Sequence, residues 1–121
     1  MSDSAFRMTM LYDFYGDLLT PRQKEFYDLY YNEDFSLAEI AENAGITRQG
    51  VRDVIVRAEA ILNEMEEKTG IIARFLTVRA GLLEIEACAE KIAQLNNDRI
   101  NSLELAELVG QIQNKVAELK E

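Results

Sequence analysis

Hydrophobic residues recur every three or four positions along most of the chain, and this spacing predicts α-helices rather than β-strands. The first such pattern predicts a helix over residues 4–19. Its apolar side chains form one broad stripe, made of Phe6, Met10, Phe14 and Leu18 and widened by Tyr12, Tyr15 and Leu19. Because a stripe of this width can cover a core, we expect the helix to pack against the rest of its domain.

A second helix is predicted from Pro21 to about Asn32. Thr20 suits the N-cap, Pro21 suits the first helical position, and Gln23 completes a capping box. The side chains that we expect to face the core are Phe26, Leu29 and Tyr30.

The middle of the chain, residues 36–62, has the outline of a helix-turn-helix. Ser36 opens a short helix, with a glutamate three residues later that completes a capping box. Gly45 ends this helix, because a left-handed turn position favours a residue without a Cβ. Thr47 then caps a longer helix that should end near Lys68. The buried stripe of this longer helix is expected to contain Val51, Val54, Ala58, Ile61 and Met65.

Beyond Gly70 the apolar positions follow alternating steps of three and four. Two such helices, separated by the polar segment 96–98, predict an antiparallel hairpin or part of a larger bundle. Asn101 or Ser102 could cap the second of them. The apolar positions are Ile71, Phe75, Val78, Leu82, Ile85, Ala89 and Ile92, followed by Leu105, Val109, Ile112, Val116 and Leu119.

Composition agrees with an all-α fold. The 121 residues include one proline and six glycines, and 48% are hydrophobic, so helix breakers are scarce and a core can form. We therefore predict a helix-turn-helix domain over residues 1–70. A heptad-patterned helical hairpin over residues 71–121 should follow it as a dimerisation element.

Net charge is −9, whereas proteins that grip duplex DNA are usually basic. Residues 1–70 carry seven Lys and Arg against fourteen Asp and Glu, so the half with the helix-turn-helix is the more acidic one. This balance counts against autonomous, tight DNA binding. It favours positive charge that is concentrated locally, or a basic partner.

Several kinds of chemistry are excluded by residue types. The chain has no histidine and a single cysteine, Cys88. This rules out nucleophile systems that need histidine, zinc sites of the Cys/His kind and an intrachain disulfide. No glycine-rich phosphate loop is present. We expect no cofactor, no metal and no enzymatic activity. We also expect no membrane span, and a cytoplasmic protein.

One surface is a candidate for binding. The helix after Thr47 presents arginine and glutamine near its N-terminal end, where a helix can reach into a nucleic-acid groove. Residues 47–57 carry three arginines against one aspartate, which is locally basic. Many helical domains share this outline without meeting nucleic acid, so both interpretations stay open. The candidate contact residues are Thr47, Arg48, Gln49, Arg52, Asp53 and Arg57.

The aromatic residues also allow two interpretations. They could stack on RNA bases, but their neighbours are mostly acidic and their spacing is that of helix-packing faces. Core packing is therefore favoured. Tyr27 and Tyr31 are the pair that we expect to be partly exposed.

Residues 18–62 resemble region 4 of the bacterial σ70-type sigma factors. The shared pattern consists of Leu19-Thr20-Pro21-Arg22, Ser36-Leu37-Ala38-Glu39-Ile40-Ala41 and Gly45-Ile46-Thr47-Arg48.

Residues 8–70 resemble the YlxM family of helix-turn-helix proteins more closely. The motifs that carry this likeness are Leu11-Tyr12-Asp13-Phe14-Tyr15, Leu18-Leu19-Thr20, Asp28-Leu29-Tyr30-Tyr31, Ser36–Glu42 and Arg48-Gln49-Gly50-Val51. The resemblance implies an all-helical protein with a domain like sigma region 4. It also implies a regulatory role beside the bacterial signal recognition particle, with the particle's GTPase and small RNA as partners.

Two functional hypotheses follow. The first is a non-enzymatic accessory of the signal recognition particle that binds its RNA or its protein. The alternative is a transcriptional regulator that binds duplex DNA as a dimer. In both, we expect a homodimer through residues 71–120, because a two-helix hairpin cannot cover both apolar stripes.

Overall fold

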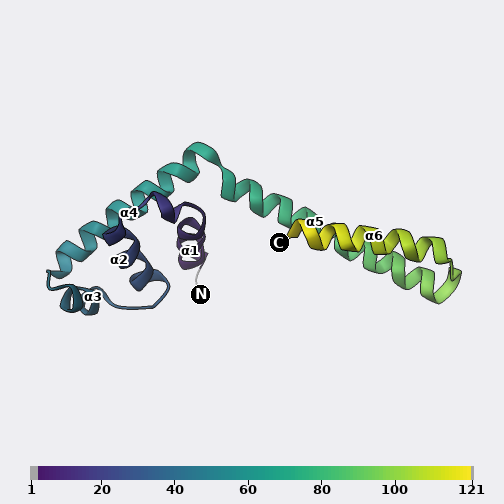
Figure 1. The fold of residues 1–121 in the computed structure, drawn as a ribbon, viewed down its shortest axis with the longest axis horizontal. Coiled ribbons are helices and arrows are strands. Elements are labelled where there is room, and N and C mark those ends of the chain that lie inside the picture. The colour runs from purple at the N-terminus through teal and green to yellow at the C-terminus, as the bar shows by residue number, and fades with distance from the viewer. Residues whose placement is uncertain (1–2, 121) are drawn as a thin grey trace. The chain divides into compact units, whose positions relative to one another are not determined.

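The computed structural model describes residues 3–120 and confirms the all-helical fold over them (Figure 1). It divides into two compact units, which we call unit 1, ending at Ile72, and unit 2, beginning at Ala73. The elements in chain order are α1 (Asp3–Tyr15), η1 (Gly16–Leu18), α2 (Pro21–Tyr31), α3 (Leu37–Ala44), α4 (Arg48–Thr69), α5 (Ile71–Leu95), η2 (Asn96–Ile100) and α6 (Leu103–Lys120).

The starts of the helices in unit 1 follow the predicted capping chemistry. The Thr20 hydroxyl accepts from the Gln23 N–H at 3.2 Å, and the Gln23 side chain accepts from the Thr20 N–H at 2.9 Å. Ser36 and Glu39 form the same reciprocal pair at the start of α3, with both distances 3.1 Å. These bonds satisfy N–H groups that have no partner inside the helix.

The turn between α3 and α4 depends on Gly45. This residue is left-handed, with φ +70°, and its N–H donates to the Ala41 carbonyl at 2.9 Å. A side chain there would meet no neighbour within 4 Å, so glycine is needed for its backbone conformation and not for space.

Replacing Gly45 with alanine should therefore lower the free energy of unfolding by about 1 kcal/mol, through backbone strain alone. Gly81 is the matched control, because it lies inside α5 and also has open space around it. Gly81→Ala should stabilise by about 0.5–1 kcal/mol, since alanine is the better helix former. Urea titrations followed by circular dichroism measure both, and effects of the same sign would contradict this explanation.

Unit 1 is built around α4, and α1, α2 and α3 all lie on one side of that helix (Figure 1). Two clusters of buried side chains fill the space between them. One consists of Leu11, Tyr15, Leu19, Tyr27, Ala58, Leu62 and Ile72. The other consists of Phe26, Ile40, Ala41, Val51 and Ile55.

The buried face of α1 differs from the prediction. Phe6 and Leu18 are both 52% exposed and Leu11 is buried in their place, whereas Tyr15 and Leu19, which were predicted to widen the stripe, are buried as expected. The helix also ends at Tyr15, and a 3-10 turn over Gly16–Leu18 follows it. Two apolar stripes compete on this helix. The core takes the one whose tyrosine hydroxyl finds polar partners, because a buried hydroxyl without a hydrogen bond is costly.

That tyrosine is bound where α4 ends. The Tyr15 hydroxyl donates to Glu66 Oε1 at 2.6 Å, and Glu66 Oε1 also accepts from the Ile72 N–H at 2.9 Å. Gly70 is left-handed there, with φ +63°. Glu66 is 8% exposed and lies among the first backbone N–H groups of α5, where a carboxylate is favoured.

The prediction for the tyrosines of α2 was wrong for two residues. Tyr27 is fully buried, and Tyr30 is 36% exposed. Tyr27 stacks on Tyr12, with ring centroids 5.4 Å apart, and its hydroxyl donates to the Met8 carbonyl. Tyr31 is half-buried and donates to Glu59 of α4. Tyr27 is buried because both its ring and its hydroxyl are satisfied inside unit 1.

Burial should make unit 1 sensitive to alkali. Loss of water around the phenol raises the pKa of Tyr27 and of Tyr31 above that of an unfolded tyrosine. Stability from these groups is complete below about pH 10 and decreases as the pH rises further, since the unfolded chain then releases protons that the folded chain retains. We expect the urea midpoint to fall between about pH 9 and about pH 11, and Tyr31→Phe to reduce that fall. A midpoint that stays constant over this range would contradict the burial of both rings.

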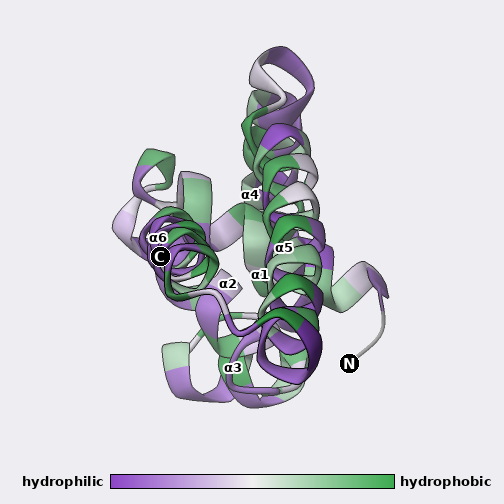
Figure 2. Cartoon of the chain, turned by 90° about the vertical axis from the view of Figure 1, so that its right-hand side faces the viewer, coloured by the Kyte–Doolittle hydropathy of each residue, from purple (hydrophilic) through white to green (hydrophobic). Residues whose placement is uncertain are grey.

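Unit 2 is an antiparallel hairpin of α5 and α6, and hydrophobic residues recur along both helices (Figure 2). Each helix buries one position per heptad, made of Leu82 and Ala89 on α5 and Val109 and Val116 on α6. The second heptad position is open, since Ile85 is 49% exposed and Ile112 is 41% exposed. An ion pair of 2.7 Å between Lys120 and Glu86 ties the end of α6 to α5.

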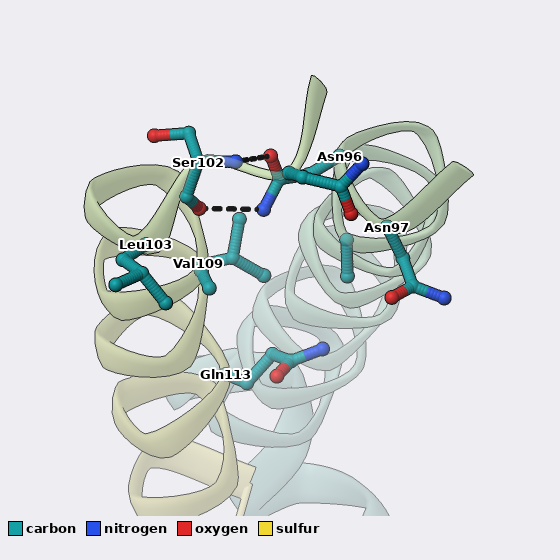
Figure 3. A pocket seen from close by; sticks show the side chains of 9 residues that line it. Asn96, Asn97, Ser102, Leu103, Val109 and Gln113 are labelled. Carbon is teal, nitrogen blue, oxygen red and sulfur yellow. Dashed lines mark hydrogen bonds between the residues drawn. The ribbon is translucent and has the colours of Figure 1, made fainter. Parts of the chain in front are cut away.

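The turn of this hairpin is longer than the polar segment that predicted it, because η2 extends to Ile100. The buried Asn96 side chain makes two hydrogen bonds with the Ser102 backbone, accepting from its N–H at 2.8 Å and donating to its carbonyl at 2.9 Å (Figure 3). The Ser102 hydroxyl accepts from the Leu105 N–H at 3.2 Å. Of the two predicted caps, Ser102 therefore acts at the start of α6.

Candidate nucleic-acid interface

The candidate interface is the surface of α4 that points away from the core of unit 1, which we call the outer face. The side chains of Val51, Ile55, Ala58 and Leu62 mark the opposite, buried face. This face is turned by roughly 50° from the predicted stripe, which contained Val54, Ile61 and Met65 instead of Ile55 and Leu62. The larger apolar residues Ile55 and Leu62 are covered by α1, α2 and α3, and the predicted residues lie half-buried at the edge of the core.

All three predicted arginines of α4 are exposed. Among residues 3–120 none of the ion pairs involves Arg48, Arg52 or Arg57. Their guanidinium groups are therefore not engaged with carboxylates of the described residues. An arginine in this state can donate hydrogen bonds to a phosphate oxygen without first losing an internal partner.

The arginines lie on two sides of the outer face. Arg52 and Arg57 are five residues apart, which places them about 140° apart around the helix axis. Gln49, Val56 and Asp53 occupy the sector between them. In a helix that enters a groove, side positions meet the sugar-phosphate backbone and the central positions meet base edges. The outer face fits this division, because it has arginines at both margins and uncharged or hydrogen-bond-accepting side chains between them.

Two of the central residues are bonded to each other. The Gln49 side-chain amide donates to Asp53 Oδ1 at 2.9 Å, one helical turn apart. The Gln49 carbonyl oxygen and the second Asp53 oxygen remain available as acceptors toward a partner. This hydrogen bond also holds the Asp53 carboxylate beside Gln49, in the centre of the outer face.

The predicted contact Thr47 has a structural role as the N-cap of α4. Its hydroxyl oxygen accepts from the Gly50 N–H at 3.0 Å. The hydroxyl proton is still free to donate, so Thr47 can contact a partner only at the very end of the helix. The structure brings Gln49, Arg52, Asp53 and Arg57 together along the outer face, with Arg48 one turn before Arg52.

Sequence reasoning missed one member of the outer face. Val56 is 46% exposed and lies between Arg52 and Arg57. An exposed aliphatic side chain in a recognition surface can contact the methyl group of thymine or the face of a base. The exposure of Val56 could have been inferred from the sequence, because this residue lies one turn beyond Arg52. An apolar residue is usually assigned to the core first, however.

The remaining features to consider are metal sites, membrane spans and the single cysteine. Among residues 3–120, no three acidic or cysteine side chains gather closely enough to hold a metal ion. Within the same range, no helix is both long and apolar enough to cross a bilayer. Cys88 is exposed on α5.

The chain matches a family model over residues 2–102, described as "Putative helix-turn-helix protein, YlxM / p13 like" and named UPF0122. A UPF0122 protein of Acetivibrio thermocellus is 41% identical over 119 residues, which is 98% of each chain. A UPF0122 protein of Halalkalibacterium halodurans is 44% identical over 93 residues, covering 77% of this chain and 85% of that one. A third, from Geobacillus kaustophilus, is 48% identical over 75 residues, covering 62% and 68%.

Proposed function

Because the chain belongs to the UPF0122 family of YlxM/p13-like helix-turn-helix proteins, we propose that it is a non-enzymatic regulatory protein that binds nucleic acid through the outer face of α4. The observation that carries this proposal is the position of Arg48, Arg52 and Arg57. They are exposed on one helix and form no ion pair with any other residue that the structure describes, within a unit whose other charged residues are mostly acidic.

We propose the bacterial signal recognition particle as the setting, with its RNA as the nucleic acid that the outer face binds and its GTPase as the alternative partner. The resemblance to YlxM proteins supplies this part of the proposal. The net charge of −9 confines any contact with nucleic acid, RNA as well as DNA, to a local basic surface. A partner with its own basic protein surface would be attracted to the acidic remainder of unit 1.

The second candidate is a dimeric regulator of transcription in the cytoplasm. The open heptad positions of unit 2 favour it, because two copies could cover them by forming a four-helix bundle. A twofold dimer would then present two α4 helices to a palindromic site. Homodimerisation is compatible with both candidates, so the partner and not the oligomeric state separates them.

Titration of the full chain against the particle's RNA, its GTPase and mixed-sequence duplex DNA, each at several salt concentrations, tests the proposal. Saturable binding to the RNA or the GTPase, with weak binding to duplex DNA, is the expected result. Tight binding to duplex DNA alone, with a steep salt dependence, would favour the regulator. Absence of binding to all three would contradict both.

Removing two arginines of the outer face should weaken nucleic-acid binding. For Arg48→Ala with Arg52→Ala, we expect affinity to fall about tenfold and the slope of log K against log salt to decrease by about 2. Arg74→Ala with Arg79→Ala is the control, because both arginines are exposed on α5 and belong to unit 2. This double control removes two positive charges as well, and it should leave both quantities nearly unchanged. Equal losses in the two variants would mean that net charge, and not the outer face, governs binding.

A further inference from the structure

A small cavity lies at the edge of the outer face of α4, where the end of α2 and the start of α3 meet that helix. Its volume is about 170 Å³. Cavities that hold drug-sized ligands measure about 300–1,000 Å³, so this one has room for a single ring system. It is lined by Tyr30, Tyr31, Leu37, Arg52, Ile55, Val56 and Glu59.

The aromatic wall of the cavity has a free surface. Tyr30 and Tyr31 make an edge-to-face contact, with ring centroids 5.0 Å apart and planes at 87°. Such a contact occupies at most one face of either ring. Tyr30 is 36% exposed, so part of its ring can still gain apolar contact from a bound group. A flat apolar ring can stack there.

The polar groups of the cavity have complementary roles. Glu59 is half-buried, and its Oε1 accepts a hydrogen bond from the Tyr31 hydroxyl, which orients the carboxylate. Its second oxygen remains an acceptor toward the cavity. Arg52 lines the same cavity and makes no ion pair among the described residues, so its guanidinium remains a donor.

From this arrangement we propose that the cavity binds the guanine base of an unpaired nucleic-acid strand. Guanine carries adjacent N–H donors at N1 and N2 and acceptors at O6 and N7. The carboxylate of Glu59 meets the donors, and the guanidinium of Arg52 meets the acceptors. The ring of Tyr30 stacks on the base. Adenine, cytosine and uracil each lack the pair of neighbouring donors.

This inference rests on the proposed nucleic-acid function and makes it more specific. A base must leave its stack to enter the cavity, so loops, bulges and single strands are recognised and an intact duplex is not. Arg52 belongs to both the outer face and the cavity, and it would link the backbone contact to the base contact.

The test compares nine-nucleotide oligouridylate with the same strand carrying one central guanine, adenine or cytosine, by fluorescence anisotropy with the full chain. Thymine-background DNA strands with the same central bases show whether the ribose matters. We expect the guanine strand to bind about tenfold more tightly than the others. Equal affinity for all strands would overturn the cavity proposal and leave nucleic-acid binding by α4 intact. No binding to any strand would overturn the cavity proposal, and the hypothesis for the outer face would then be judged on the particle's RNA.

Three variants separate the contributions. Glu59→Gln keeps the acceptor for Tyr31 but can place an N–H₂ donor against the donors of guanine, so the preference for guanine should fall to about one- to twofold. Tyr30→Ala should lower the affinity for the strand with the central guanine about fivefold or more. Arg57 lies outside the cavity, so Arg57→Ala should weaken the binding of all strands alike and leave the preference for guanine unchanged. Circular dichroism melting checks that each variant is folded.

Discussion

Replacing Leu62 with alanine is expected to lower the free energy of unfolding of unit 1 by about 2–5 kcal/mol. Leu62 is fully buried on α4, in the cluster that also contains Leu11, Tyr15 and Tyr27. Truncation would remove apolar contacts within this cluster and leave a cavity in its place. A loss of this size is a large fraction of the stability of a small domain.

Tyrosine fluorescence in a urea titration measures this loss, because all five tyrosines lie at or before residue 31 and therefore report on unit 1. Leu18→Ala is the matched control, since Leu18 is in the same unit but 52% exposed. It should cost less than about 1 kcal/mol. Similar losses for the two leucines would mean that α4 is not the centre of the unit 1 core.

Replacing Ile112 with glutamate is expected to weaken self-association by about 100-fold or more. Ile112 occupies the open heptad position of α6 and is 41% exposed in the single chain. A twofold interface would contain the substitution twice, and each copy would lose apolar burial and bury a charge. The same open stripe continues along α5 through Val78, Ile85 and Ile92.

Sedimentation measures this effect at concentrations from about 1 to 100 μM, a range in which specific dimers of ordinary strength form. Wild type should sediment with the mass of two 13.8 kDa chains, and Ile112→Glu with the mass of one. Gln111→Glu is the control, because it adds the same side chain at the exposed neighbouring position. A wild-type monomer throughout this range would contradict the proposed homodimer.

The features that depend on local chemistry could be predicted from the sequence. Thr20, Ser36 and Thr47 act as caps because each hydroxyl reaches an N–H group only three residues away. Gly45 and Gly70 end their helices because few other residues adopt the left-handed conformation at low cost. These interactions need no knowledge of the rest of the fold.

The faces of the helices could be predicted only in part. On α1 and α2 several stripes are apolar enough to be buried, and the choice between them depends on distant partners such as Glu66 for Tyr15 and Met8 for Tyr27. On α4 the exposure of the arginines followed from their charge. The cavity beside Arg52 could not be foreseen, because Tyr30 and Glu59 are far apart in the sequence and only packing brings them together.

The most direct test of the central claim is amide chemical-shift mapping on α4 during titration with the particle's RNA. If the outer face binds nucleic acid, the largest changes will fall on Gln49, Arg52, Asp53 and Arg57, and they will weaken as salt is added. Changes confined to α5 and α6, or no changes at saturating RNA, would contradict the claim that α4 presents its arginines to nucleic acid.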